Sequence, residues 1–166
     1  MIDDSKQQIF EDMFRDFLDP LTVPIIGFGG AGGNVLEKVR EKLDKDQYLQ
    51  SSNVKTIHFS TKSKDSRRLN VNFQFQISSP ILGEHDDTEG FVEVGEKILE
   101  ETLDNLSLIK PDLLKDFKNA EAIILVAGLG GGMGTGGIIE MLTYLNHHAP
   151  WVPVFVILML YLQCQH

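Results

Sequence analysis

Apolar and polar positions along this 166-residue chain follow two patterns that repeat in alternation. Continuous apolar runs at Val23–Phe28 and Ala122–Ala127 are typical of strands buried on both faces of a parallel sheet. A strand is also predicted at Val54–Ser60, and an edge strand at the alternating segment Val71–Ile77. The first part of a later apolar run, Val154–Leu160, is predicted to be a buried strand.

Apolar residues at helical spacing fill the segments between these strands. Such spacing is found at Val35–Leu43, Phe91–Leu106 and Ile138–Leu145, and a shorter helix is predicted at Pro111–Phe117. Because strands alternate with helices, right-handed crossovers predict an α/β fold: a doubly wound, Rossmann-like parallel sheet in a three-layer α/β/α arrangement. The expected strand order is three-two-one-four-five.

An amphipathic helix is predicted ahead of the first strand, over Ser5–Leu18, with Asp19-Pro20 as its stop. We expect it to pack on the surface of the domain rather than to act as a partner-binding arm. Residues 1–20 are therefore interpreted as an N-terminal extension, and residues 21–166 as one domain.

Two glycine-rich segments, Gly27–Asn34 and Gly128–Gly137, join strands to helices and hold twelve of the fifteen glycines. A helix that starts in this way leaves backbone N–H groups unpaired at the positive end of its dipole. Both segments would meet at the carboxyl edge of a parallel sheet, where such folds bind ligands. A tight turn needs only one or two glycines, so we interpret the excess as a phosphate cradle, with a plain strand-to-helix turn as the alternative.

Charge and composition limit the ligands, partners and cellular locations that fit this sequence. Neither glycine segment contains the lysine of a Walker motif, so phosphate would be held by backbone dipoles, with Mg²⁺ as a possible companion. A net charge of −9 argues against nucleic acid and anionic membrane surfaces as partners. Pro153–Leu162 is too short to span a bilayer, and the acidic N-terminus does not resemble a signal peptide. With Cys164 as the single cysteine, a cytoplasmic location is expected.

The two glycine segments resemble those of the tubulin/FtsZ superfamily, and of its FtsZ branch in particular. The first segment reads Gly27-x-Gly29-Gly30-x-Gly32-Gly33-Asn34, as FtsZ proteins do. The second reads Gly130-Gly131-Gly132-Met133-Gly134-Thr135-Gly136, which departs from the family signature Gly-Gly-Gly-Thr-Gly-Thr-Gly only at Met133. The resemblance extends over roughly residues 22 to 160 and identifies the chain as a member of this family.

The resemblance implies a GTP- or GDP-binding domain, incomplete at its C-terminus, in a protein that polymerises head-to-tail with FtsZ-like subunits in cell division or a related role. Thr135 keeps a family hydroxyl. Valine at Gly132 or Gly134 is expected to fill the space of the ligand and leave the fold intact. The residues that inherit the phosphate contacts are Gly29, Gly30, Ala31, Gly32, Gly33, Asn34, Gly130, Gly131, Gly132, Met133, Gly134, Thr135 and Gly136.

Other positions depart from the family pattern. Lys62 stands where the family commonly has aspartate, and we expect it to be a solvated surface lysine. The acidic loop Glu84–Glu89 contains Asp86 and Asp87, which we also expect to be solvated rather than metal-binding. No catalytic residue is assigned, because the resemblance places the hydrolytic aspartates on a loop that follows His166. The chain alone is therefore expected to be inactive as a GTPase.

Two alternatives remain open. One is a non-hydrolysing FtsZ-like regulator or filament-interaction module. The other is a Rossmann NAD(P)-binding domain, for which Gly27-x-Gly29-x-x-Gly32 is a formal match. The dinucleotide hypothesis expects an acid after the second strand, where Ser60-Thr61-Lys62 stands, and it leaves the second glycine segment unexplained.

Overall fold

A computed structural model describes residues 22–46, 53–61, 69–77, 88 and 90–160 of the chain. These residues contain a five-stranded, fully parallel sheet with the order β3-β2-β1-β4-β5. The sequence-based prediction of fold class and strand order is therefore confirmed. The strands are β1 (Thr22–Phe28), β2 (Asn53–Ser60), β3 (Phe73–Gln76), β4 (Ile123–Leu129) and β5 (Val154–Leu160).

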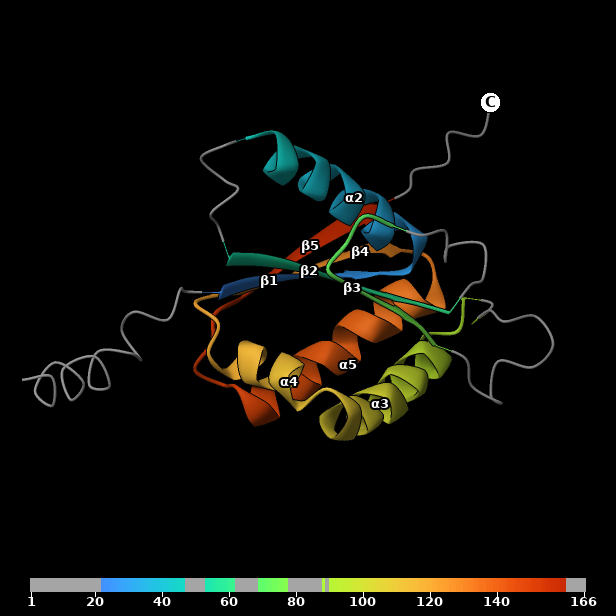
Figure 1. The fold of residues 1–166 in the computed structure, drawn as a ribbon. Coiled ribbons are helices and arrows are strands. Elements are labelled where there is room, and N and C mark those ends of the chain that lie inside the picture. Colours follow the sequence, from blue (N-terminus) through green and yellow to red (C-terminus); the bar gives the residue numbers. More distant parts are fainter. Residues whose placement is uncertain (1–21, 47–52, 62–68, 78–87, 89, 161–166) are drawn as a thin grey trace, which may run out of the picture.

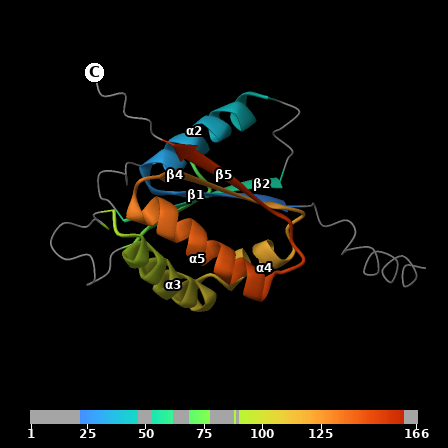
Figure 2. The ribbon, with the colours of Figure 1, turned by 180° about the vertical axis from the view of Figure 1, so that it is seen from behind.

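Helices cover both faces of this sheet and make it a three-layer structure (Figure 1). The helix α2 (Gly29–Lys45) lies on one face. The other face carries α3 (Val92–Ile109), α4 (Pro111–Lys118) and α5 (Gly132–His148), as the reverse view also shows (Figure 2). Three sequence-based predictions fall outside the described residues: the helix Ser5–Leu18, the solvated Lys62, and the acidic loop with Asp86 and Asp87.

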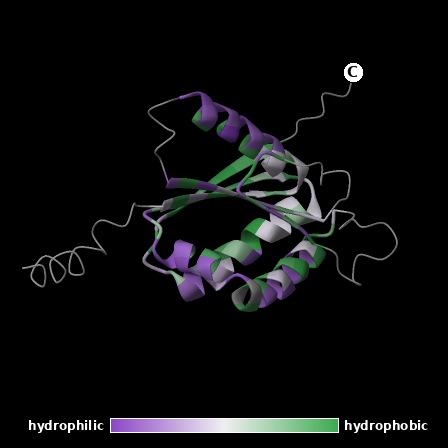
Figure 3. Ribbon diagram, viewed as in Figure 1, coloured by the Kyte–Doolittle hydropathy of each residue, from purple (hydrophilic) through white to green (hydrophobic). Residues whose placement is uncertain are grey.

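The main hydrophobic core lies between the sheet and the layer of three helices. Side chains of β1, β2 and β3 point toward it, and three of their rings stack in a row: the Phe28 and Phe59 centroids are 5.8 Å apart, and those of Phe59 and Phe75 are 5.0 Å apart. Hydrophobic residues follow the central strands and α5, whereas α2 and α4 are largely hydrophilic (Figure 3). Burial of this apolar surface is what drives the sheet and the three helices together.

Glycines allow α3 and α5 to approach each other at their N-terminal ends. A Cβ at Gly95 would collide with the Gly132 carbonyl, and a Cβ at Gly136 would collide with the Val92 carbonyl. Contact at this distance needs hydrogen in place of a side chain on both helices. The start of α3 is thereby fixed against the start of α5.

The structure corrects the predicted extent of the glycine loops. α2 begins at Gly29 rather than after Asn34, and α5 begins at Gly132, so much of both glycine-rich segments is helical. Helix propensity predicted otherwise, because glycine is about 1 kcal/mol less favourable than alanine in a helix interior. Tertiary contacts of these glycines, described below, outweigh that propensity.

β5 also differs from the prediction of a buried strand. It is the last strand of the sheet, and Phe155 and Leu160 are 60% and 72% exposed. The prediction was wrong because a continuous apolar run indicates a strand but does not say whether another element covers it. β3 is an edge strand, as predicted. None of the described helices is long and apolar enough to cross a membrane.

Two leucines of α3 provide a test of this packing. Leu99 is fully buried in the core, whereas Leu108 is 82% exposed. Leu99→Ala is expected to lower the free energy of unfolding by about 2–5 kcal/mol, because it removes buried methyl groups and leaves a cavity. Leu108→Ala is expected to change it by less than about 0.5 kcal/mol. Urea unfolding of both variants measures the difference, and equal losses would contradict the described burial of α3.

Candidate functional site

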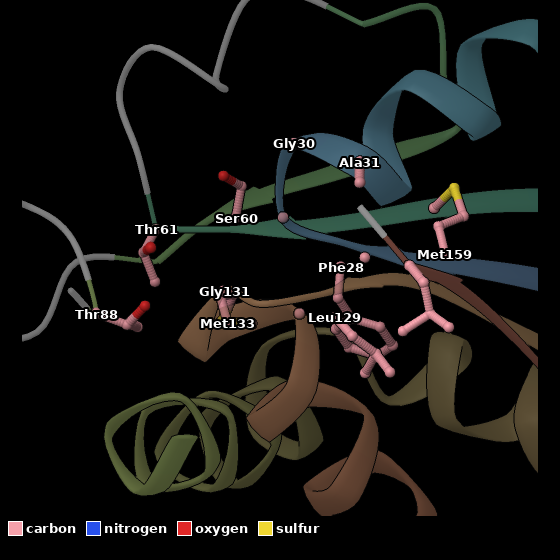
Figure 4. A pocket seen from close by; sticks show the side chains of 14 residues that line it. Phe28, Gly30, Ala31, Ser60, Thr61, Thr88, Leu129, Gly131, Met133 and Met159 are labelled. Carbon is pink, nitrogen blue, oxygen red and sulfur yellow. The ribbon is translucent and has the colours of Figure 1, made fainter. Parts of the chain in front are cut away.

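A cavity of about 320 Å³ opens at the carboxyl edge of the sheet, between the first turns of α2 and α5 (Figure 4). This is the edge at which parallel α/β sheets commonly bind ligands. No side chain that lines it among the described residues carries a formal charge. The lining residues are Phe28, Gly29, Gly30, Ala31, Ser60, Thr61, Thr88, Gly128, Leu129, Gly131, Met133, Gly134, Met159 and Leu160.

Two helix N-termini face this cavity without a capping side chain. α2 begins directly after Phe28, with Gly29 in the left-handed region at φ 63°, and α5 begins directly after Gly131. Neither N-cap residue makes a side-chain hydrogen bond to its helix. The N–H groups of a first helical turn have no partner within the helix, and the helix dipole adds positive potential there. The arrangement favours an anion between the two helices.

The cavity has a polar end and an apolar end (Figure 4). Ser60, Thr61 and Thr88 bring three hydroxyl groups to one end. Phe28 and Met159, together with Leu129, line the other. A ligand with both a strongly polar and an apolar part fits such a gradient.

Thr56, His58 and Ser60 are buried polar residues at alternate positions of β2, on the face toward α2. The residues between them, Ile57 and Phe59, point to the opposite face and join the core. Thr56 is hydrogen-bonded to Asn72, with its backbone N–H 2.8 Å from Asn72 Oδ1. His58 Nε2 lies 2.9 Å from the Gly29 carbonyl oxygen.

Ser60 is the last member of this row, and it reaches the cavity. Its side chain is 1% exposed, and its Oγ has no hydrogen-bond partner among the described residues. An unpaired buried hydroxyl costs a folded protein about 1–3 kcal/mol, so native structures rarely keep one without a reason.

Packing accounts for most of the glycines that suggested a phosphate cradle. A Cβ at Gly32 would lie 2.8 Å from both the Gly27 carbonyl carbon and the Val126 oxygen, so α2 could not rest on the sheet. A Cβ at Gly33 would lie 2.9 Å from His58 Nε2. The argument that glycines beyond the one or two of a tight turn have no structural role is therefore wrong, while the phosphate cradle itself stays a prediction.

The expected effect of valine at two of these positions is also corrected. A Cβ at Gly132 would collide with the Phe91 carbonyl and lie 2.6 Å from Thr88 Oγ1, and a Cβ at Gly134 would collide with the Gly128 carbonyl. Valine at either position would disturb the fold itself. Gly130 and Gly131, in contrast, have open space where a Cβ would be. Gly131 also has ordinary extended backbone, with φ −114° and ψ 142°.

Six of the thirteen predicted site residues line the cavity: Gly29, Gly30, Ala31, Gly131, Met133 and Gly134. Met133 also belongs to the core, at 4% exposed. The remaining seven do not line it, and they are Gly32, Gly33, Asn34, Gly130, Gly132, Thr135 and Gly136.

Sequence reasoning did not assign Ser60, Thr61, Thr88 or Met159 to the site. The signal for Ser60 and Thr61 was present, because both follow a predicted strand at the carboxyl edge of the sheet. Thr88 comes into place only because α3 packs against the start of α5, and Met159 only because β5 pairs with β4. These two depend on contacts between segments far apart in the sequence.

Acidic side chains gather away from the cavity, between α3 and α5. Burial raises the pKa of Glu140, and the neighbouring carboxylates of Glu100, Glu96 and Asp104 raise it further. None of these residues lines the cavity. The described residues contain no group of three or more His, Cys, Asp or Glu side chains that could hold a metal ion.

Comparison with known protein families decides the classification. The family model "Tubulin/FtsZ family, GTPase domain" matches residues 22–161. The chain belongs to this family. The match covers every strand of the sheet, and both helices whose N-termini face the cavity.

Individual relatives agree with this assignment. The cell division protein FtsZ of Buchnera aphidicola is 30% identical over 122 residues, which are 69% of this chain and 26% of that protein. FtsZ of Aquifex aeolicus is 29% identical over 127 residues, which are 74% of this chain and 29% of that protein. The chain thus spans less than a third of the length of these curated relatives.

Solved structures show the same fold. The GDP-bound monomer of CetZ1 from Haloferax volcanii superposes with a TM-score of 0.66 and 23% identity, over 83% of this chain and 41% of that one. The empty FtsZ dimer from M. jannaschii gives a TM-score of 0.62 and 17% identity, over 93% of this chain and 40% of that one. At these identities the likeness concerns the fold.

Two glycines of the same segment test the packing explanation. Gly134→Ala is expected to destabilise the fold by about 1–3 kcal/mol, because the added Cβ overlaps the Gly128 carbonyl. Gly131→Ala is expected to cost less than about 1 kcal/mol, since its Cβ meets open space and only the N-cap preference for glycine over alanine is lost. Urea unfolding compares the two. Propensity alone predicts the opposite for Gly134, so a stabilising effect of alanine there would contradict the described contact.

Proposed function

We propose that this chain binds a guanine nucleotide and holds its phosphates between the first turns of α2 and α5. The observation that carries the proposal is the Ser60 hydroxyl, which is buried, without a partner among the described residues, and placed where two uncapped helix N-termini meet. A phosphate oxygen would accept hydrogen bonds from this hydroxyl and from the N–H groups of both helix starts. Family membership supports GTP and GDP as the ligands.

The two ends of the cavity suggest an orientation for the nucleotide. We place the outer phosphates at the hydroxyl end, beside Ser60, Thr61 and Thr88. The ribose would then lie toward the apolar end formed by Phe28 and Met159. This orientation matches charged oxygens with donors and the carbon-rich part of the nucleotide with apolar side chains.

The larger role follows the family. We propose that the parent protein is a cytoplasmic, FtsZ-like GTPase that assembles head-to-tail, as in cell division. Its relatives support the nucleotide, the self-association and the role in division: two are cell division proteins, the CetZ1 structure holds GDP, and one FtsZ structure is a dimer. Residues 21–166 would supply its phosphate-binding region.

Hydrolysis is a separate matter from binding. Among the described residues, the cavity lining offers no carboxylate and no imidazole that could act as a general base. We therefore propose binding, rather than turnover, as the activity of this chain by itself. Mg²⁺ would be held mainly by the phosphates, as it usually is in nucleotide sites.

A non-hydrolysing regulator of FtsZ-like filaments is the second candidate. Such a regulator could use the same nucleotide site. It would differ from the proposed GTPase in that the full-length protein would not hydrolyse GTP in filaments. A dinucleotide-binding domain is less well supported, because β2 ends in Ser60 and Thr61 where a ribose-binding acid is expected.

Calorimetric titration with GDP and Mg²⁺ tests the proposal, with ATP and NADH as competing ligands. We expect GDP to bind and NADH not to compete, whereas competition by ATP measures whether the site distinguishes the base. Gly131→Val is expected to weaken GDP binding at least tenfold, because Gly131 lines the cavity and a side chain there meets no protein atom that would hold it away from a ligand. Its unfolding free energy should fall by no more than about 1 kcal/mol, because position 131 is the N-cap of α5, where valine is less favourable than glycine. GDP affinity that is unchanged in this variant would contradict the placement of the phosphates.

Ser60→Ala tests the observation that carries the proposal, because it should move stability and binding in opposite directions. Removing a buried, unpaired hydroxyl is expected to raise the unfolding free energy of the free chain by about 1 kcal/mol. The same change removes a donor to a charged phosphate and is expected to weaken GDP binding about tenfold. A variant that loses stability but keeps its affinity would show that Ser60 serves the fold instead.

A further inference from the structure

A buried imidazole lies directly behind the phosphate-binding face of the first helix start. His58 is fully buried on β2, and its Nε2 lies 2.9 Å from the carbonyl oxygen of Gly29, the first residue of α2. A carbonyl oxygen can only accept a hydrogen bond, so Nε2 carries the hydrogen and donates it. His58 itself does not line the cavity.

Gly33 admits this ring. A Cβ at Gly33 would lie 2.9 Å from His58 Nε2 and 3.0 Å from a Leu69 methyl group, so any larger residue would displace one of them. Gly33 is buried one turn into α2 and does not line the cavity. Its role in the described structure is therefore to let the imidazole reach the first turn of the helix.

We propose that His58 is a positioning residue that fixes the Gly29–Gly30 peptide so that the Gly30 N–H faces the phosphates. The described chain contains no cis peptide bond, so the Gly30 N–H points opposite to the Gly29 carbonyl. Because His58 holds that carbonyl from the α2 side of the sheet, the N–H turns toward the cavity, which Gly30 lines. This inference rests on the proposed nucleotide binding.

Gly29 is where such a constraint has most effect. Its φ of 63° lies in the left-handed region, and glycine exchanges readily between this region and others. As the first residue of α2, Gly29 already has its carbonyl within the helix, and His58 adds a second donor that restricts this carbonyl further before a ligand arrives; preorganisation of this kind raises affinity without any new contact to the ligand. The effect expected of one such hydrogen bond is about threefold to tenfold in affinity.

A pair of substitutions at position 58 separates the hydrogen bond from packing. His58→Leu fills much of the same space without a donor, whereas His58→Gln places an amide N–H near the position of Nε2. We expect His58→Leu to weaken GDP binding threefold to tenfold and His58→Gln to restore most of it. Equal affinity of wild type and His58→Leu, or equal losses in both variants, would overturn the proposal.

Thr56→Val is the matched control. Thr56 lies on the same strand and face and is equally buried, but it is hydrogen-bonded to Asn72 and does not line the cavity. We expect this variant to lose stability and keep its GDP affinity. If His58→Leu does not fold, Gly33→Ala replaces it, since its Cβ pushes the ring away from Gly29 and should lower affinity to a similar extent.

Nuclear magnetic resonance of the free chain keeps this test independent of the proposed function. The imidazole nitrogen spectrum is expected to show the hydrogen on Nε2, and the Gly30 amide resonance is expected to shift in His58→Leu and not in Thr56→Val. A wild-type chain that fails to bind GDP would reject nucleotide binding. An unprotonated Nε2, or an unmoved Gly30 resonance, would reject the role of His58.

Discussion

The close approach of two helix starts to the end of the sheet is the constraint on which the rest of this structure depends. Gly32 lets α2 lie on β1 and β4, and Gly134 lets α5 lie on the Gly128 carbonyl, because hydrogen replaces a side chain at each contact. This approach leaves a cavity where helix dipoles converge and no charged side chain is present among the described lining residues. In a chain with a net charge of −9, such a place is suited to polyphosphate because its attraction comes from oriented amides.

β2 connects the interior of the protein with this site. Thr56, His58 and Ser60 occupy successive positions on one face of the strand, from the middle of the sheet to its edge. Thr56 is hydrogen-bonded to Asn72, His58 contacts the backbone of α2, and Ser60 lines the cavity, with its Oγ buried and without a partner among the described residues. The same strand buries Ile57 and Phe59 on its other face. The core that stabilises the fold therefore also fixes the position of these polar groups along the strand.

The sequence determined the element order, the parallel sheet and the family. Continuous apolar runs separated by helical spacing leave few topologies once crossovers are right-handed, and the prediction of strand order was confirmed. The glycine segments identified the family correctly, and six of the thirteen residues drawn from them line the cavity. Both results depend on local patterns, which a sequence displays directly.

Only the tertiary structure decided what each glycine and each polar residue of β2 does. Gly33 and Gly131 belong to equally glycine-rich segments, yet one admits the His58 ring and the other faces open space. β5 is exposed because no described element covers it, and Thr88 lines the cavity because α3 packs against α5. The physical reason is that a steric contact or a buried hydrogen bond depends on the distance between segments far apart in the chain. The periodicity of one segment says nothing about that distance.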